Sequence, residues 1–144
     1  MHGLVQNVEF RVVGAAVAAG AAIDDNSARI DMTPYESVTF VAPITASVST
    51  GVATLAIEQN DLDQDAGMAE ISGTAATRIS AGANDIAGTA LVTEVFKPNR
   101  RYVQAVRRSG VANIAYGPII AILVPRRLPS AQGATVAAVA RTAN

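Results

Sequence analysis

The fold is decided by LVTEVFKPNRRYVQAVRRSG, residues 91–110, in which two stretches of alternating side chains flank a turn. In the first stretch, Leu91 and Val95 flank Thr93 on one side of an extended chain. Successive side chains of a strand point to opposite faces, so this alternation is typical of a half-buried strand and not of a helix. The residues Lys97-Pro98-Asn99 that follow are typical of a turn. The segment therefore predicts two β-strands joined by a turn.

The same alternation recurs along the chain, and turn sequences rich in Gly, Pro, Asn and Asp separate the runs. No stretch has a convincing amphipathic helical period. The runs predict strands at about residues 5–14, 28–32, 36–43, 52–59, 68–72, 89–96, 101–107 and 113–124. Regularly spaced short strands of this kind predict an all-β protein, a single antiparallel β-sandwich that is jelly-roll-like and has extended terminal segments.

A chain of 144 residues corresponds to one domain. We expect the β-sandwich to occupy residues 1–128. Residues 129–144 contain no apolar side chain larger than valine, so we expect an extended C-terminal tail or arm there. The alanine-rich segment 14–23 is interpreted as a strand end and a loop, because two glycines weaken a helix at this position.

The last strand, YGPIIAILVP (residues 116–125), is apolar on both faces. It is either a central strand covered on both sides or a strand whose second face meets another chain. Pro118 and Pro125 indicate an edge strand, or a strand that is bounded at both ends. An edge strand with two apolar faces would favour pairing with another chain, so the pattern favours a protein partner.

Charge is distributed unevenly. Residues 1–96 contain all 12 acidic residues and 3 basic ones, a net charge of −9, whereas residues 97–144 contain 8 basic residues and no acid. The whole chain carries a net charge of −1. Such asymmetry indicates complementary pairing within the fold, between copies of the chain, or with an acidic partner.

Most of the basic residues flank the strand that begins at Tyr102 or follow the last strand. Nucleic-acid binding is disfavoured, because few aromatic residues accompany them and the sequence pI is about 5.7. Two compatible interpretations stay open: pairing with acids of neighbouring strands (Asp31, Glu36, Glu58 or Glu94), and contact with a protein partner, where arginine is enriched. The candidate interface residues are Lys97, Arg100, Arg101, Tyr102, Arg107, Arg108, Arg126 and Arg127.

Signatures of catalysis are missing from the sequence. The single histidine, His2, is at the N-terminus, which is a poor position for a general base. There is no cysteine, and no glycine-rich nucleotide-binding motif. We therefore expect no enzymatic activity and no cofactor. The apolar stretches are also too short to span a bilayer, so we expect no membrane association.

The segment NDLDQDAGMAE, residues 60–70, is the nearest approach to a metal-binding motif and is called the acidic turn below. It places aspartates at the first, third and fifth positions of an EF-hand-like loop: Asp61, Asp63 and Asp65. Ala66 and Ser72 stand where that loop needs Gly and Glu. A solvated turn between strands is the preferred interpretation, and a weak calcium site that includes Glu70 is the alternative.

The order of these segments is similar to that of a known family. The relevant stretches are IDMTPYESVTFVAPI (30–44), ATLAIEQNDLDQDAGMAEI (53–71), LVTEVFKPNRRYVQAVRRSG (91–110) and an apolar strand ending in VPRRLP (124–129). Together, over residues 28–129, they resemble the capsid decoration, or cement, proteins of tailed bacteriophages.

The resemblance implies a β-sandwich that trimerises and binds the outer surface of the major capsid protein shell, where it stiffens the head by contact and not by chemistry. Arg100, Arg101 and Tyr102 fall within the matching motif. The implied partners are the major capsid protein and further copies of the chain, and the implied location is the outside of the virion. The alternative is a head or tail accessory module that binds carbohydrate or calcium, although the low aromatic content, 4%, argues against a sugar platform.

Overall fold

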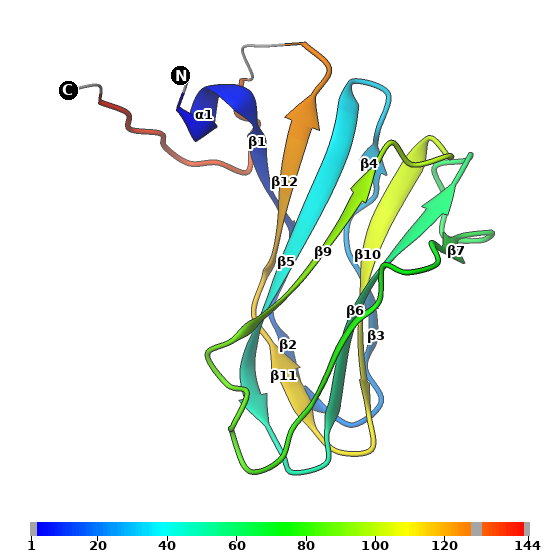
Figure 1. Cartoon of the computed structure of the whole chain (residues 1–144), viewed down its shortest axis with the longest axis vertical. Helices are drawn as coiled ribbons and strands as arrows, with labels where there is room; N and C mark the ends of the chain where they lie inside the picture. The colour runs from blue at the N-terminus through cyan, green and yellow to red at the C-terminus, as the bar shows by residue number, and fades with distance from the viewer. Residues whose placement is uncertain (1–2, 128–130, 143–144) are drawn as a thin grey trace.

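Two antiparallel β-sheets face each other across an apolar core in the computed structural model, which describes residues 3–127 and 131–142 (Figure 1). The first sheet contains β1 (Glu9–Gly14), β2 (Val17–Gly20), β5 (Tyr35–Ser47), β9 (Ala90–Phe96), β11 (Ile114–Tyr116) and β12 (Ile119–Pro125). The second sheet contains β3 (Asp24–Asn26), β4 (Ile30–Asp31), β6 (Val52–Asn60), β7 (Ala69–Glu70), β8 (Ala76–Ile79) and β10 (Tyr102–Gly110).

The strand order is that of a jelly roll. Several short strands are two pieces of one longer strand: β3 and β4 both pair with β10, β7 and β8 both pair with β6, and β11 and β12 both pair with β5. With β1 and β2 joined in the same way, eight strands result, four in each sheet. Numbered along the chain, the first sheet has the order 1-8-3-6 and the second 2-7-4-5. The predicted antiparallel, jelly-roll-like sandwich is thus confirmed.

The predicted strands differ from the observed ones mainly where strands break. The predicted strand 113–124 is interrupted between β11 and β12 at Gly117 and Pro118, because proline lacks the amide that would continue the ladder. The prediction of a loop over residues 14–23 was wrong for β2, which pairs with β11. The first residues of the predicted strand 5–14 belong to a short helix, α1 (Leu4–Asn7).

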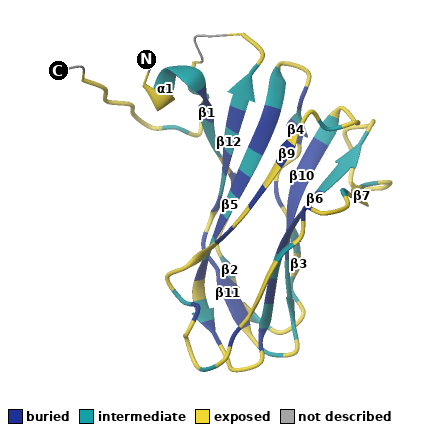
Figure 2. Ribbon diagram, in the orientation of Figure 1, coloured by how far each residue is buried: buried dark blue, intermediate teal, exposed yellow. Residues whose placement is uncertain are grey.

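The core forms because every second residue of the main strands points between the sheets. In β5, Val38, Phe40 and Ala42 are fully buried, and Leu55 and Ile57 of β6 meet them from the second sheet. Buried and partly exposed residues consequently alternate along the strands in Figure 2. Burying apolar surface at about 25 cal/mol per Å² is the main favourable contribution to folding.

Strand β12 lies inside the first sheet, between β1 and β5. The edge-strand interpretation was therefore wrong, and the two prolines instead bound the strand, since Pro118 precedes it and Pro125 ends it. One side of β12 packs in the core through Ile119, Ala121 and Leu123. Its other side forms part of a half-exposed surface described below.

The tail residues 131–142 contain no helix or strand and lie beside α1 and β1 (Figure 1). The Gln132 side chain accepts a hydrogen bond from the Phe10 amide at 2.8 Å and donates one to the Val8 carbonyl at 2.8 Å. The Thr135 hydroxyl accepts from the Val12 amide at 3.1 Å. These contacts satisfy amides on the outer edge of β1. The predicted domain boundary at residues 128 and 129 lies outside the described residues, as does His2.

Candidate protein interface

Five of the predicted interface residues lie at one end of the sandwich, called the basic end: Lys97, Arg100, Arg101, Arg126 and Arg127. Two backbone hydrogen bonds connect the segments that carry these residues, 97–101 and 126–127, to residues 32–34. The Arg126 amide donates to the Pro34 carbonyl at 2.9 Å, and the Met32 amide donates to the Arg101 carbonyl at 2.8 Å. Tyr102 begins β10 at the same end. Arg107 and Arg108 lie further along β10, so the structure separates these two residues from the basic end.

Three of the five charges at the basic end are paired within the chain. The Arg101 guanidinium donates two hydrogen bonds to the Asp31 carboxylate, at 3.1 and 2.8 Å, and Arg100 pairs with Asp61. Lys97 lies 3.9 Å from a Glu36 oxygen. The hydrogen bonds from Arg101, followed by those from Thr33, lower the pKa of Asp31 well below its ordinary value. The predicted pairing with Asp31 and Glu36 is therefore observed, whereas Glu94 accepts a hydrogen bond from Thr39 instead.

Arg126 and Arg127 differ, because neither forms an ion pair with any carboxylate of residues 3–127 or 131–142. Arg126 borders two neighbouring surface hollows, of about 490 and 340 Å³. The larger one is called the arginine hollow, and it is lined by Met32, Thr33, Tyr35, Pro98, Arg100, Arg101 and Arg126. Among the described residues, three guanidinium groups and no carboxylate line it. The hollow thus concentrates positive charge at the basic end.

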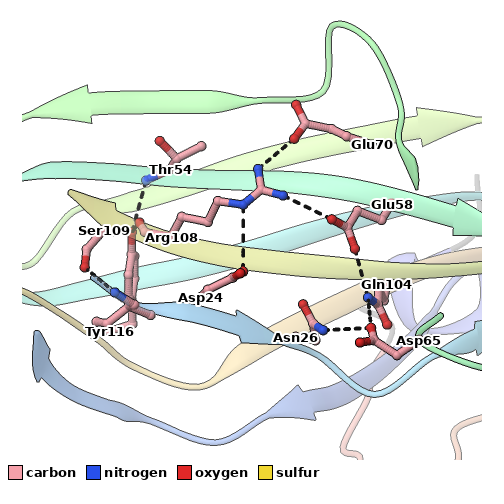
Figure 3. Close-up of polar contacts among 11 residues, drawn as sticks. Asp24, Asn26, Thr54, Glu58, Asp65, Glu70, Gln104, Arg108, Ser109 and Tyr116 are labelled. Atoms are coloured by element: carbon pink, nitrogen blue, oxygen red, sulfur yellow. Dashed lines mark hydrogen bonds and ion pairs between the residues drawn. The ribbon is translucent and has the colours of Figure 1, made fainter. Parts of the chain in front are cut away.

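Arg108 is held by acids on the outer face of the second sheet (Figure 3). Its guanidinium donates to Glu70 at 2.6 Å and to Glu58 at 3.0 Å. Nearby, the Gln104 amide donates to Glu58 at 2.9 Å and to Asp65 at 3.0 Å. The acidic turn thereby folds back over β10, and Gln104 is completely buried. This face of the second sheet is closed by polar contacts within the chain.

Arg107 points into the sandwich and is 1% exposed. Its guanidinium donates to the carbonyls of Gly117 at 2.6 Å and Ala15 at 2.7 Å, and it pairs with Asp25 at 2.6 Å. Ala15 and Gly117 lie at the two breaks of the first sheet, so Arg107 ties both breaks to β10. A signal for this role was present in the sequence, since alternation places Arg107 on the same side as the core residue Val103.

The three aspartates of the acidic turn engage three different sets of partners. Asp61 pairs with Arg100, Asp63 pairs with Arg29 at 2.7 Å, and Asp65 accepts hydrogen bonds from Asn26 and Gln104. Nowhere in the described part of the chain do three or more candidate ligand residues come together in a way that could hold a metal ion. The described segments likewise include no helix long and apolar enough for a lipid bilayer.

A second candidate surface, called the apolar face, is the outer side of the first sheet. Strand register places Val12, Ile120, Val41 and Val92 opposite one another across β1, β12, β5 and β9. The chain neighbours of Ile120, Val41 and Val92 are buried, as is Val13 beside Val12, so these four side chains point away from the core. Val12 is 44% exposed and Val92 is 54% exposed. An unbroken row of branched apolar side chains therefore crosses the sheet on its open side.

Adjacent rows extend the apolar face. Phe10 lies opposite Ile122 in the next row, and Val124 and Phe96 lie on either side of Ser37 in the row beyond it. Phe96 is 59% exposed, and the Lys97 ammonium lies 5.0 Å from the centre of its ring. Glu94 contributes a charged side chain to the row of Phe10 and Ile122, where it lies opposite Thr39. The sequence indicated only the β12 part of this face, through the apolar run 116–125, because the neighbouring strands are known only from the fold.

No protein-family model matches the chain, and its sequence matches none of the curated proteins. Among solved structures, the fold is similar to a chain in the structure of infectious bursal disease virus, Gt strain. That similarity has a TM-score of 0.41 and 8% sequence identity, and it covers 82% of this chain and 32% of the viral chain. This chain thus spans about a third of the viral one. The jelly-roll assignment rests on the strand order itself.

Proposed function

We propose that this chain is a structural, non-catalytic virion protein that decorates the outer surface of the major capsid protein shell as a homotrimer. The apolar face is the observation that carries the proposal. Large exposed apolar patches on soluble proteins mark contact surfaces. A row of four aliphatic residues with Phe10, Ile122 and Phe96 beside it is such a patch.

A second copy of the chain is the occupant that best suits this face. Permanent interfaces between identical subunits are more apolar and poorer in charge than transient ones. In the apolar face, the Glu94 carboxylate accepts a hydrogen bond from Thr39 at 3.2 Å, and the residues around it are mainly Val, Ile and Phe. A partner met only after folding would leave this surface exposed to aggregation, whereas other copies of the chain are present from synthesis onward.

Trimers and attachment to the shell are supported by the sequence resemblance of residues 28–129 to phage decoration proteins. The jelly-roll fold alone is no argument for this role, because the same architecture hosts unrelated functions. The charges offer a consistent second line of support. Most arginines and acids are paired within the chain, so assembly would rest on apolar contact supplemented by the few unpaired cations.

The test is co-sedimentation of the purified chain with shells assembled from the major capsid protein of the same virus. We expect saturable binding at a fixed ratio of chain to capsid subunit. Val92→Glu, at the β9 end of the apolar row and 54% exposed, should reduce binding strongly by breaking the trimer and its multivalent attachment.

Ile79→Glu is the matched control, since Ile79 is also an exposed aliphatic strand residue, at 61%, but lies on β8 of the second sheet. This variant should bind like the unmodified chain. Absence of saturable binding by the unmodified chain would refute the proposed function. Equal loss in both variants would show that the apolar face has no special role.

A further inference from the structure

We infer that the arginine hollow binds a carboxylate-bearing segment of a partner protein, with Arg126 as its main contact. If that segment belongs to a capsid subunit, the inference deepens the proposed function and rests on it. The binding chemistry itself stands on the basic end alone.

Arg126 is held in place but lacks a counter-charge. Its amide is anchored to the Pro34 carbonyl at 2.9 Å, and its side chain borders both hollows. Arg100 and Arg101 line the same hollow, and each already has a carboxylate partner, whereas Arg126 has none among the described residues. An incoming carboxylate would supply the counter-charge that Arg126 lacks.

The free polar groups of the hollow are donors. The Thr33 hydroxyl donates to Asp31 at 2.7 Å, and the Tyr35 hydroxyl is engaged by Glu9 and by Arg11, the latter at 2.9 Å. Guanidinium N–H groups are therefore the main binding groups left for a ligand. An ionised carboxylate only accepts hydrogen bonds, and it matches the planar fork of arginine with two parallel bonds.

The walls of the hollow fit a protein segment better than a free anion. Met32, Tyr35 and Pro98 supply apolar surface beside the guanidinium groups. The volume of about 490 Å³ lies within the range of roughly 300–1,000 Å³ that is usual for binding sites. An acidic side chain with apolar neighbours would use both the charge and the apolar walls.

A nucleic acid fits this end less well. Single-stranded nucleic acids need a continuous basic path and exposed aromatic rings for stacking. Here Asp61 and Asp31 pair with Arg100 and Arg101, so the basic residues of the hollow do not form a continuous path for a chain of phosphates. Tyr35 is half-buried with its hydroxyl occupied, and the Arg101 guanidinium lies 5.1 Å from the centre of the Tyr102 ring.

The experiment is a fluorescence anisotropy titration of fluorescein-labelled hexaglutamate with the full chain at low salt. We expect saturable binding that weakens as salt is added. Arg126→Gln, which keeps the anchoring amide and a side chain of moderate length, should weaken binding about tenfold. Arg78→Gln is the matched control, because Arg78 is also an exposed arginine with no ion pair to the described residues, and it should have no effect.

Three outcomes would overturn the inference: no binding of hexaglutamate, equal weakening in Arg126→Gln and Arg78→Gln, or tighter binding of a twelve-residue oligothymidylate that depends on Arg126. Circular dichroism of each variant checks that it is folded. The proposed function is judged separately, by shell co-sedimentation. Binding to shells without binding to hexaglutamate would refute only this inference. Binding to hexaglutamate without binding to shells would refute only the proposed function.

Discussion

Replacing Arg107 with alanine should strongly destabilise the fold. Sequence reasoning placed this residue among the candidates for contact with a partner, but its side chain lies inside the sandwich. From β10, Arg107 donates hydrogen bonds to Ala15 and Gly117, the residues at the two strand breaks of the first sheet. Arg107→Ala therefore distinguishes a role in folding from a role in assembly.

The size of the effect follows from the groups that would lose their donor. The carbonyls of Gly117 and Ala15 accept from Arg107 at 2.6 and 2.7 Å, and an unsatisfied buried polar group costs about 1–3 kcal/mol. Asp25 is partly exposed, with 40% of its side-chain surface accessible, so water can replace its lost partner. Adding the cavity, we expect a loss of about 3–5 kcal/mol, the range for breaking a buried ion pair.

The assay is urea unfolding followed by far-ultraviolet circular dichroism, at equal protein concentration because the stability of an oligomer depends on it. With a dependence of about 1–3 kcal/mol per molar urea, the midpoint should fall by roughly 2 M. Arg29→Ala is the control, because its ion pair with Asp63 is exposed and its loss should hardly move the midpoint. An Arg107→Ala midpoint within about 0.5 M of the unmodified chain would refute this account of Arg107.

Three further outcomes are expected. Burial raises the pKa of Tyr116 to about 12. The Tyr116 hydroxyl donates a hydrogen bond to the Arg108 carbonyl and accepts one from the Thr54 amide, both in the second sheet. Because Tyr116→Phe removes both bonds, it should lower the free energy of unfolding by about 1–2 kcal/mol in the same urea assay. Asp31→Asn should be less stable than the unmodified chain at pH 7. Because the pKa of Asp31 is lowered in the folded state, that difference should shrink as pH falls below about 3.9, and a constant difference down to pH 2 would be contrary evidence. Millimolar calcium should leave the melting temperature unchanged, since separate partners hold the aspartates of the acidic turn, whereas a rise of several degrees would favour the calcium-binding alternative.

The main strands could be predicted from sequence because their alternation reports burial directly. The short strand β3 could not, since Asp24, Asp25 and Asn26 have no apolar side chain. It forms because register places Asp24 opposite Arg108 and Asp25 opposite Arg107 on β10. Cross-strand charge pairing thus substitutes for apolar burial, and only the fold brings those residues together.

The candidate surfaces were predictable to different degrees. The resemblance and the charge count both drew attention to Arg100 and Arg101, and the structure shows that each has an acid partner of its own. Arg126 could not be singled out from the sequence, because only the fold brings it beside the turn at Pro34. The apolar face was visible in sequence only along β12. Val12 and Val92 are 80 residues apart in sequence, and strand pairing alone places them in one row.

The most direct test of the central claim is the solution mass of the full chain and two variants by light scattering. The central claim is that the apolar face joins copies of the chain in a trimer. The unmodified chain and Ile79→Glu should both have three times the chain mass of 14.7 kDa. Val92→Glu should be a folded monomer. A monomeric unmodified chain, or a Val92→Glu variant that stays trimeric, would contradict the claim.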